Sequence, residues 1–159
     1  MGDVSIKERL ASYQGLKFEY DTECDNWYER YVRLKNEQYI PAMREGDGSK
    51  RNPGASDRMG NATVRRIECE EQHQDEIGVI DGIKTKMRAI EELINTLPDP
   101  MHRAVLKQRY IVGGEGYCLK KWADITMSMY HRDDDTAQTR VQRLHRKAIE
   151  KLEEMANGN

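Results

Sequence analysis

The sequence predicts an all-α protein in which a long antiparallel helical hairpin is followed by a small three-helix domain. Its 159 residues are 34% charged and 37% hydrophobic, with a mean hydropathy of −0.92. That is too little apolar surface for a thick globular core, but enough for helices that bury a narrow stripe. Four prolines, with frequent glutamate, lysine, arginine, methionine and leucine, favour helix over sheet. Two apolar runs with heptad spacing indicate the two arms of the hairpin.

The first helix is expected from residue 5 to residue 43. Its apolar and aromatic residues recur in alternating steps of three and four, and Lys17 and Gln38 fill the two gaps in this pattern. Ser5, with Glu8 three residues later, has the spacing of a capping box. The pattern predicts a helix that packs along one side, and a docking surface for a partner protein is the second interpretation. The seam consists of Ile6, Leu10, Tyr13, Tyr20, Cys24, Trp27, Tyr31 and Leu34.

A polar loop is expected from residue 44 to residue 57, where three glycines and a proline interrupt the helical pattern. The second helix is expected from residue 58 to residue 96, with Ser56 or Asp57 as its cap. Its second half again shows heptad spacing. The seam there consists of Ile80, Ile83, Met87, Ile90, Ile94 and Leu97.

The first half of this second helix has a weaker pattern. Val64, Ile67 and Ile77 are its expected apolar anchors, and the glycines at positions 78 and 82 predict a break, kink or phase shift within residues 70–82. The acidic run at residues 68–76 is interpreted as a solvated face.

Pro98 and Pro100 predict the end of the second helix, because proline cannot continue a helix interior. We therefore divide the chain into residues 1–97, the hairpin, and residues 98–159, the C-terminal domain. Two long helices joined by one loop fold back as an antiparallel pair. The exposed remainder of their seams predicts a coiled-coil surface for self-association or for docking of a partner.

The C-terminal domain is expected to contain three helices. Asp99 is placed to cap the first, which runs to Val112 and ends where three of the next four residues are glycine. The second is expected from Leu119 to Met129. The predicted core residues of these two helices are Val105, Leu106, Tyr110, Leu119, Trp122, Ile125 and Met129.

The last helix is expected from residue 136 to residue 152, after a turn from Tyr130 to Asp135. This turn is longer than a tight helix-turn-helix connection and ends in three consecutive aspartates. Asp135 or Thr136 is the expected cap, and Asp135 with Gln138 has capping-box spacing. The inward stripe of the helix consists of Val141, Leu144, Ala148, Ile149 and Leu152.

A basic outer face distinguishes this last helix, which carries five lysine or arginine residues against one glutamate between residues 136 and 152. A short helix, a turn and a longer basic helix form the arrangement in which the second helix enters the DNA major groove. Glutamine pairs bidentately with adenine and arginine with guanine, while Lys120 and Lys121 are placed to contact phosphates. A solvated amphipathic helix is the simpler interpretation of the same pattern. The outward or flanking residues are Gln138, Thr139, Arg140, Gln142, Arg143 and Arg146.

Three segments carry a resemblance to a known family: LPDPMHRAVLKQRYI, KKWADITMSM and RVQRLHRKAIEKL. Together they resemble the sigma-70 region 4-like helix-turn-helix module of small bacteriophage late-gene transcriptional regulators, the RinA/ArpU-like group. The resemblance is specific over the last 60 residues and loose before them. The matching positions are Leu97, Val105, Leu106, Arg109, Tyr110, Ile111, Trp122, Ile125, Arg143, Leu144, His145, Ala148, Ile149 and Leu152.

The resemblance implies a sequence-specific DNA-binding regulator, an activator of phage late genes, that inserts helix 136–152 in the major groove of double-stranded DNA. It implies action in the cytoplasm of a bacterial host, a homo-oligomer formed through the N-terminal helices, and host RNA polymerase as a further partner. His145 and Arg146 are implied to lie near the DNA backbone. The residues implied to read DNA are Gln138, Thr139, Arg140, Gln142 and Arg143.

Other function classes find little support in the sequence. It has no glycine-rich phosphate loop, HExxH or GxSxG motif, so we expect neither an enzyme nor a cofactor. The cysteines at positions 24, 69 and 118 are far apart and form no CxxC, so no metal site is expected. The sequence contains no run of about 18 apolar residues, so no membrane span is expected. Two alternatives stay open: a phage small terminase subunit that recognises DNA for packaging, and a helical interaction module that does not bind DNA.

Overall fold

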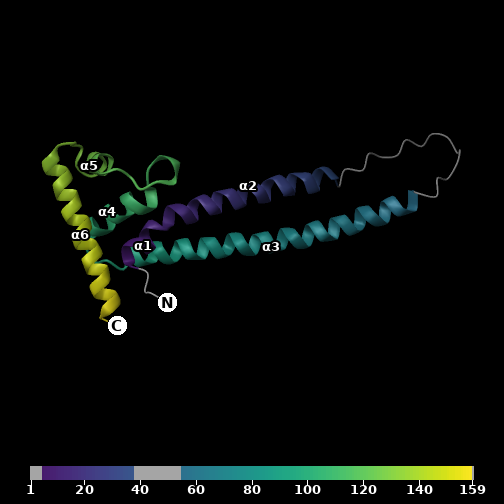
Figure 1. Ribbon diagram of the computed structural model, residues 1–159, viewed down its shortest axis with the longest axis horizontal. Coiled ribbons are helices and arrows are strands. Elements are labelled where there is room, and N and C mark those ends of the chain that lie inside the picture. The colour runs from purple at the N-terminus through teal and green to yellow at the C-terminus, as the bar shows by residue number, and fades with distance from the viewer. Residues whose placement is uncertain (1–4, 38–54, 159) are drawn as a thin grey trace. The chain divides into compact units, whose positions relative to one another are not determined.

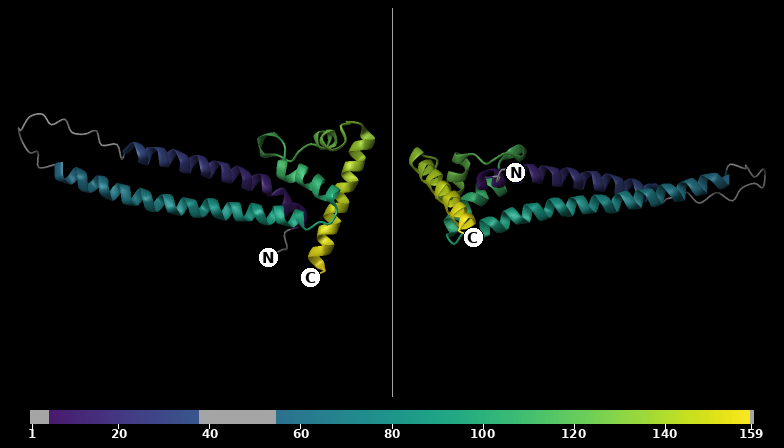
Figure 2. Two further views of the ribbon diagram at one scale, coloured as in Figure 1. Left: turned by 180° about the vertical axis from the view of Figure 1, so that it is seen from behind. Right: turned by 60° about the horizontal axis from the view of Figure 1, so that its bottom comes forward.

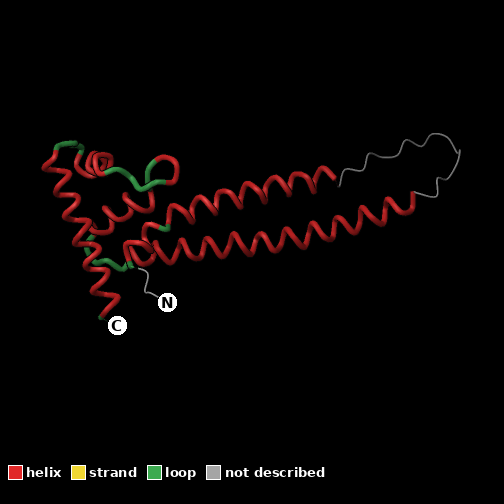
Figure 3. Tube along the Cα trace, in the orientation of Figure 1, coloured by secondary structure: helices red, strands yellow, loops and turns green. Residues whose placement is uncertain are grey.

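The computed structural model describes residues 5–37 and 55–158, and every element within them is helical (Figures 1 and 3), which confirms the all-α class. The chain divides into two compact units. Unit 1 combines residues 1–20 with residues 83–159, and unit 2 comprises residues 21–82. Among the described residues, no helix is both long and apolar enough to cross a membrane.

The chain enters unit 1 through α1 (Ile6–Ala11), whose capping box forms as predicted. The Ser5 hydroxyl accepts a hydrogen bond from the Glu8 amide at 3.3 Å, and the Glu8 carboxylate accepts one from the Ser5 amide at 3.1 Å. The single helix expected over residues 5–43 is interrupted at Ser12, whose hydroxyl donates to the Arg9 carbonyl at 2.7 Å. Such a bond back to the preceding turn bends a helix. Helix α2 (Tyr13–Glu37) follows, and residues 38–43 lie outside the described residues.

Helix α3 (Ala55–Asn95) is continuous over 41 residues, so the predicted break within residues 70–82 is wrong. Glycine lowers helix stability by about 1 kcal/mol relative to alanine, which a long packed helix tolerates. Ser56 and Asp57 lie inside α3 rather than at its cap, so the helix begins earlier than expected. The rest of the predicted loop, residues 44–54, lies outside the described residues.

Within unit 2, the segments of α2 and α3 run side by side in opposite directions (Figures 1 and 2). The Trp27 and His73 rings stack with centroids 4.9 Å apart, and Arg30 forms an ion pair with Glu76. The acidic run at residues 68–76 therefore contributes contacts as well as a solvated face. The expected anchors of this part of α3 are wrong, because they are exposed. These are Val64, Ile67 and Ile77, at 54%, 51% and 41% exposure.

The core of unit 1 joins the ends of both long helices to the C-terminal helices. These are α4 (Pro100–Leu106), a π-helical turn η1 (Lys107–Val112), a 3₁₀ turn η2 (Glu115–Tyr117), α5 (Trp122–Tyr130) and α6 (Asp135–Asn157). Leu97, at which the sequence divides the chain, is 1% exposed within this core. Helix α5 begins at Trp122 and not at Leu119 as expected, and Leu119 lies in the preceding loop, where it packs partly buried against the core. The buried apolar residues of this core cluster are Leu10, Tyr13, Ile90, Ile94, Leu97, Val105, Leu106, Tyr110, Ile125, Val141, Ala148, Ile149 and Leu152.

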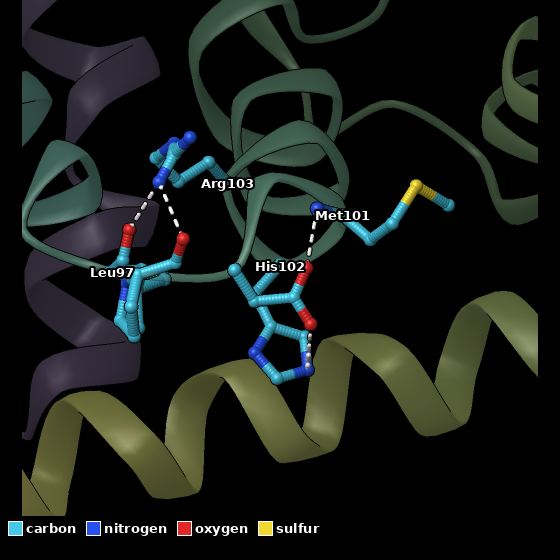
Figure 4. Close-up of polar contacts among 6 residues, drawn as sticks. Leu97, Met101, His102 and Arg103 are labelled. Atoms are coloured by element: carbon cyan, nitrogen blue, oxygen red, sulfur yellow. Dashed lines mark hydrogen bonds and ion pairs between the residues drawn. The ribbon is translucent and has the colours of Figure 1, made fainter.

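The junction between α3 and α4 is held by polar contacts (Figure 4). The Asp99 carboxylate caps α4 by accepting a hydrogen bond from the Met101 amide at 2.8 Å, as predicted. The Arg103 guanidinium donates to the carbonyls of Leu97 and Pro98. These bonds satisfy carbonyls beyond the end of α3 that have no partner within the helix.

A buried glutamine secures the end of η1, and the sequence does not predict it. Gln14 is 4% exposed, and its amide nitrogen donates to the carbonyls of Tyr110 and Ile111 at 2.6 and 3.1 Å. The chain then turns at Gly113, where φ is +65°, a value that favours glycine. A Cβ at this position would lie 2.5 Å from the Gln14 amide nitrogen, so the glycine also makes room for the glutamine.

Candidate nucleic-acid interface

The start of α6 is fixed by a four-residue turn at residues 131–134. Helix α5 ends at Tyr130, with His131 in the left-handed region at φ 54°, and α6 begins at Asp135. The predicted turn, from Tyr130 to Asp135, is thus too long, because each helix takes in one of its end residues. A connection of this length is close to the three or four residues found in helix-turn-helix units.

Asp134 caps α6, so the expected caps Asp135 and Thr136 are wrong by one or two positions. Its carboxylate accepts a hydrogen bond from the Ala137 amide at 2.8 Å and lies 3.1 Å from the Arg132 guanidinium. Negative charge at a helix N-terminus is stabilised by the helix dipole. Helix initiation therefore accounts for an acidic residue at this point.

Asp133 also contacts the first turn of α6, through the side chain of Gln138. Its carboxylate accepts a hydrogen bond from the Gln138 amide nitrogen at 3.0 Å. The Gln138 side chain is half-buried, unlike most of the predicted reading residues. One of its donors is thus engaged within the chain.

The first half of α6 exposes one continuous side that carries no acidic residue between positions 136 and 147. Val141 and Ala148, both at 0% exposure, hold the opposite side against the core. Side chains two residues from Val141 lie about 200° around a helix from it, so Thr139 and Arg143 point away from the core. The exposed residues are Thr136, Thr139, Arg140, Gln142, Arg143, Arg146 and Lys147.

Arg140 lies at the corner between α5 and α6. Its guanidinium is 5.4 Å from the centroid of the Tyr130 ring, at which distance cation–π attraction restrains it. Arg140 also helps to line shallow hollows, together with Thr136, Thr139, Arg143, Arg146 and Lys147, among others.

The charge of the exposed side reverses along α6. Glu150, Glu153 and Glu154 are exposed beyond the basic half, and Lys151 pairs with Glu154 at 2.8 Å. Four cations therefore face solvent before residue 148, and carboxylates dominate after it. An anionic ligand would be attracted to the N-terminal half of the helix.

The two lysines before α5 differ in their surroundings. The Lys120 ammonium donates to the Gln108 side-chain oxygen at 2.6 Å and to the Ser128 hydroxyl at 3.1 Å, so it binds within the chain. Lys121 occupies the N-cap position of α5 and is exposed. Of this pair, Lys121 is the cation that is open to an external phosphate.

His145 points into the protein and not along the exposed side. Its Nε2 lies 2.9 Å from the Tyr110 hydroxyl, a hydrogen-bond distance, and its ring meets the Trp122 ring edge-on at 5.1 Å. Burial lowers the pKa of His145 from 6.5 to about 4, and the positive charges of Arg109 and Lys7 act in the same direction. The imidazole is therefore neutral at pH 7. Its placement does not suit the backbone contact that the resemblance implies.

Two exposed residues of this side are absent from the sequence-based set. Lys147 and Thr136 share hollows with Arg140, one turn or two turns along the helix. The spacing of Arg140, Arg143 and Lys147, in steps of three and four, is the signal that identifies Lys147.

Within the described ranges, no group of three histidine, cysteine or acidic side chains is arranged to hold a metal ion. No protein-family model, curated protein or solved structure matches the chain. Inferences about function therefore rest on the geometry and chemistry of α5 and α6, together with the resemblance of their sequence.

Proposed function

We propose that this protein is a sequence-specific DNA-binding regulator of transcription that inserts the N-terminal half of α6 in the major groove. The observation that carries the proposal is the exposed side of α6 between residues 136 and 147, which combines four cations with glutamine and threonine and contains no carboxylate. Arginine and glutamine are the side chains best suited to base edges, and clustered cations suit phosphates.

The way α6 is supported favours this proposal over a merely solvated helix. The turn at residues 131–134 and the Asp134 cap hold its N-terminus in a defined position beside α5. In helix-turn-helix proteins, the N-terminal residues of the second helix contact the bases. A basic face restricted to that end matches this use, since a uniformly solvated helix has no reason to separate its charges.

The proposed roles follow from the position of each side chain around the helix. Arg143, opposite the core, is assigned to a base edge together with Thr139 and Gln142. Arg146 is assigned to the phosphate backbone beside the groove, and Lys147 joins it there. We further propose that the protein regulates phage late genes, as the family that it resembles does, and that it self-associates through α2 and α3.

A salt series with matched variants tests the proposal. The sequences that the protein prefers are first selected from random duplex DNA, and affinity is then measured by fluorescence anisotropy from 50 to 300 mM salt. If four cations meet phosphates or bases, the slope of log K against log salt is about −3 to −4. Arg146→Ala is expected to flatten this slope by about one unit, and Arg143→Ala to reduce sequence preference about tenfold or more.

Lys151→Ala is the matched control, because it removes one cation from the same helix outside the basic side. We expect it to leave both slope and preference unchanged. Equal effects of Lys151→Ala and Arg146→Ala would indicate attraction to the helix as a whole. An absence of binding to any duplex at 50 mM salt would refute the DNA proposal and favour a protein-interaction module.

A further inference from the structure

The inward side of α6 contains one polar side chain at a position where its neighbours are apolar. His145 lies four residues after Val141 and three before Ala148, so the three share one side of the helix. Both neighbours are fully buried, while His145 is half-buried among aromatic rings. An apolar residue would bury this side at lower cost, because a buried polar group must be hydrogen-bonded.

The contacts of His145 are directional. Its Nε2 meets the Tyr110 hydroxyl of η1 at 2.9 Å, and its ring stands at 75° to the Trp122 ring of α5. The Arg109 guanidinium lies 4.3 Å from the centroid of the same tryptophan and donates to the Lys120 carbonyl. The imidazole thus contacts two other elements, each of which is itself held in place.

The other contacts that orient the basic half of α6 are apolar, apart from contacts near its start such as the Gln138–Asp133 hydrogen bond. Between residues 136 and 147, Val141 is the single fully buried side chain and Leu144 packs partly buried against the core, while Ala148, Ile149 and Leu152 anchor the rest of the helix by apolar packing alone. Apolar packing is non-directional, whereas a hydrogen bond weakens steeply outside a narrow range of distance and angle. At the helix surface, a rotation of ten degrees moves a side chain by about 1 Å, enough to break a hydrogen bond to a base edge.

We propose that the Tyr110–His145 hydrogen bond sets the rotation of α6, so that these two residues position Arg143 and its neighbours for sequence reading without touching DNA. The inference rests on the proposed DNA binding and specifies how that surface discriminates between sequences. It assigns His145 a positioning role in place of the backbone contact implied by the resemblance.

Tyr110→Phe removes the bond without altering any surface residue. We expect it to lower the ratio of affinities for a selected and a scrambled duplex about tenfold, the scale of one base contact. Affinity for the scrambled duplex, and its salt slope, should not change, because every cation remains in place. His145→Gln, whose amide can still meet the hydroxyl, should retain more of the ratio than His145→Leu.

Tyr13→Phe is the matched control. Tyr13 is also buried in unit 1, and its hydroxyl donates to the carboxylate of Glu91 in α3, not to a residue of α6. The inference predicts an unchanged affinity ratio for this variant; a fall as large as that of Tyr110→Phe would reveal a general effect of core damage and overturn it. If Tyr110→Phe kept the wild-type ratio of affinities for selected and scrambled duplexes, this inference would also be overturned, while the DNA proposal would stand. Wild-type protein that binds no duplex, or binds all duplexes alike, would instead refute sequence reading itself.

Discussion

Replacing Gln14 with leucine tests the least expected contact of unit 1. Leucine fills much of the same space but donates no hydrogen bond, so the carbonyls of Tyr110 and Ile111 lose the amide that they share. These carbonyls lie in the last turn of η1, where a helix has no N–H groups left to offer. We therefore expect Gln14→Leu to loosen the link between α2 and η1.

The cost follows from burial. A buried acceptor left unsatisfied costs about 1–3 kcal/mol. The bond to Tyr110 is buried and the bond to Ile111 is partly buried, which gives a loss of about 2–4 kcal/mol in the free energy of unfolding. For a chain of this size, that corresponds to a fall in Tm of roughly 5–12 °C.

The two tryptophans of the chain allow unit 1 to be followed separately. Trp27 lies in unit 2 and Trp122 in unit 1, so Trp27→Phe leaves Trp122, beside His145, as the single tryptophan. Urea and thermal unfolding of Gln14→Leu are measured in this background, with Gln72→Leu as the control for an exposed glutamine. A Gln14→Leu midpoint within about 1 °C of that control would show that the buried amide contributes no stability.

The same reasoning predicts that Gln14 and Gly113 interact. Gly113→Ala imposes a positive φ on alanine, at about 1–2 kcal/mol, and places a Cβ 2.5 Å from the Gln14 amide. In the Gln14→Ala background the overlap is gone, so Gly113→Ala should cost less there than in wild-type protein. Strictly additive losses would contradict the described packing.

Two further predictions concern proton binding and helix propensity. Burial, together with Arg109 and Lys7, lowers the pKa of His145 from 6.5 to about 4, so between these pH values the unfolded chain binds more protons than the folded chain. The free energy of unfolding, measured by urea titration, should therefore fall by on the order of 2–3 kcal/mol as the pH drops from 6.5 to 4. His145→Gln should remove that part of the fall. Gly78→Ala and Gly82→Ala should each stabilise α3 by about 0.5–1 kcal/mol, because an added Cβ meets nothing within 4 Å at either position. Faster hydrogen exchange in α3 of either variant would contradict this expectation.

The helical pattern could be predicted wherever apolar periodicity is strong. The seam from Ile80 to Leu97 and the stripe from Val141 to Leu152 face inward as expected, because burial of an amphipathic face determines helix orientation. The predicted caps Ser5 and Asp99 form, whereas the capping box suggested by Asp135 and Gln138 does not. Local patterns sufficed for the seam, the stripe and the two caps that form.

The sequence was less informative where several adjacent residues could each cap a helix, and where two residues in contact are far apart in the chain. Any of the three consecutive aspartates could begin α6, and the choice of Asp134 depends on where α5 ends. Gln14 donates hydrogen bonds to Tyr110 and Ile111, which lie 96 and 97 positions further along the chain, and no local pattern reveals such a contact. His145 follows the reading residues in sequence, yet its ring is drawn inward by Tyr110 and Trp122.

Acidic residues on both sides of the basic face bear on the proposed mode of DNA binding. Residues 136–147 span about 18 Å at 1.5 Å per residue, compared with a major groove about 12 Å wide. Aspartates 133–135 precede this stretch and Glu150, Glu153 and Glu154 follow it, so phosphates are repelled at both ends. At physiological ionic strength this repulsion acts over about 8 Å, which is shorter than the basic stretch itself. In the proposed complex, a shift of α6 along its axis would bring carboxylates towards a phosphate strand. The same aspartates that start the helix would therefore also limit its register in the groove.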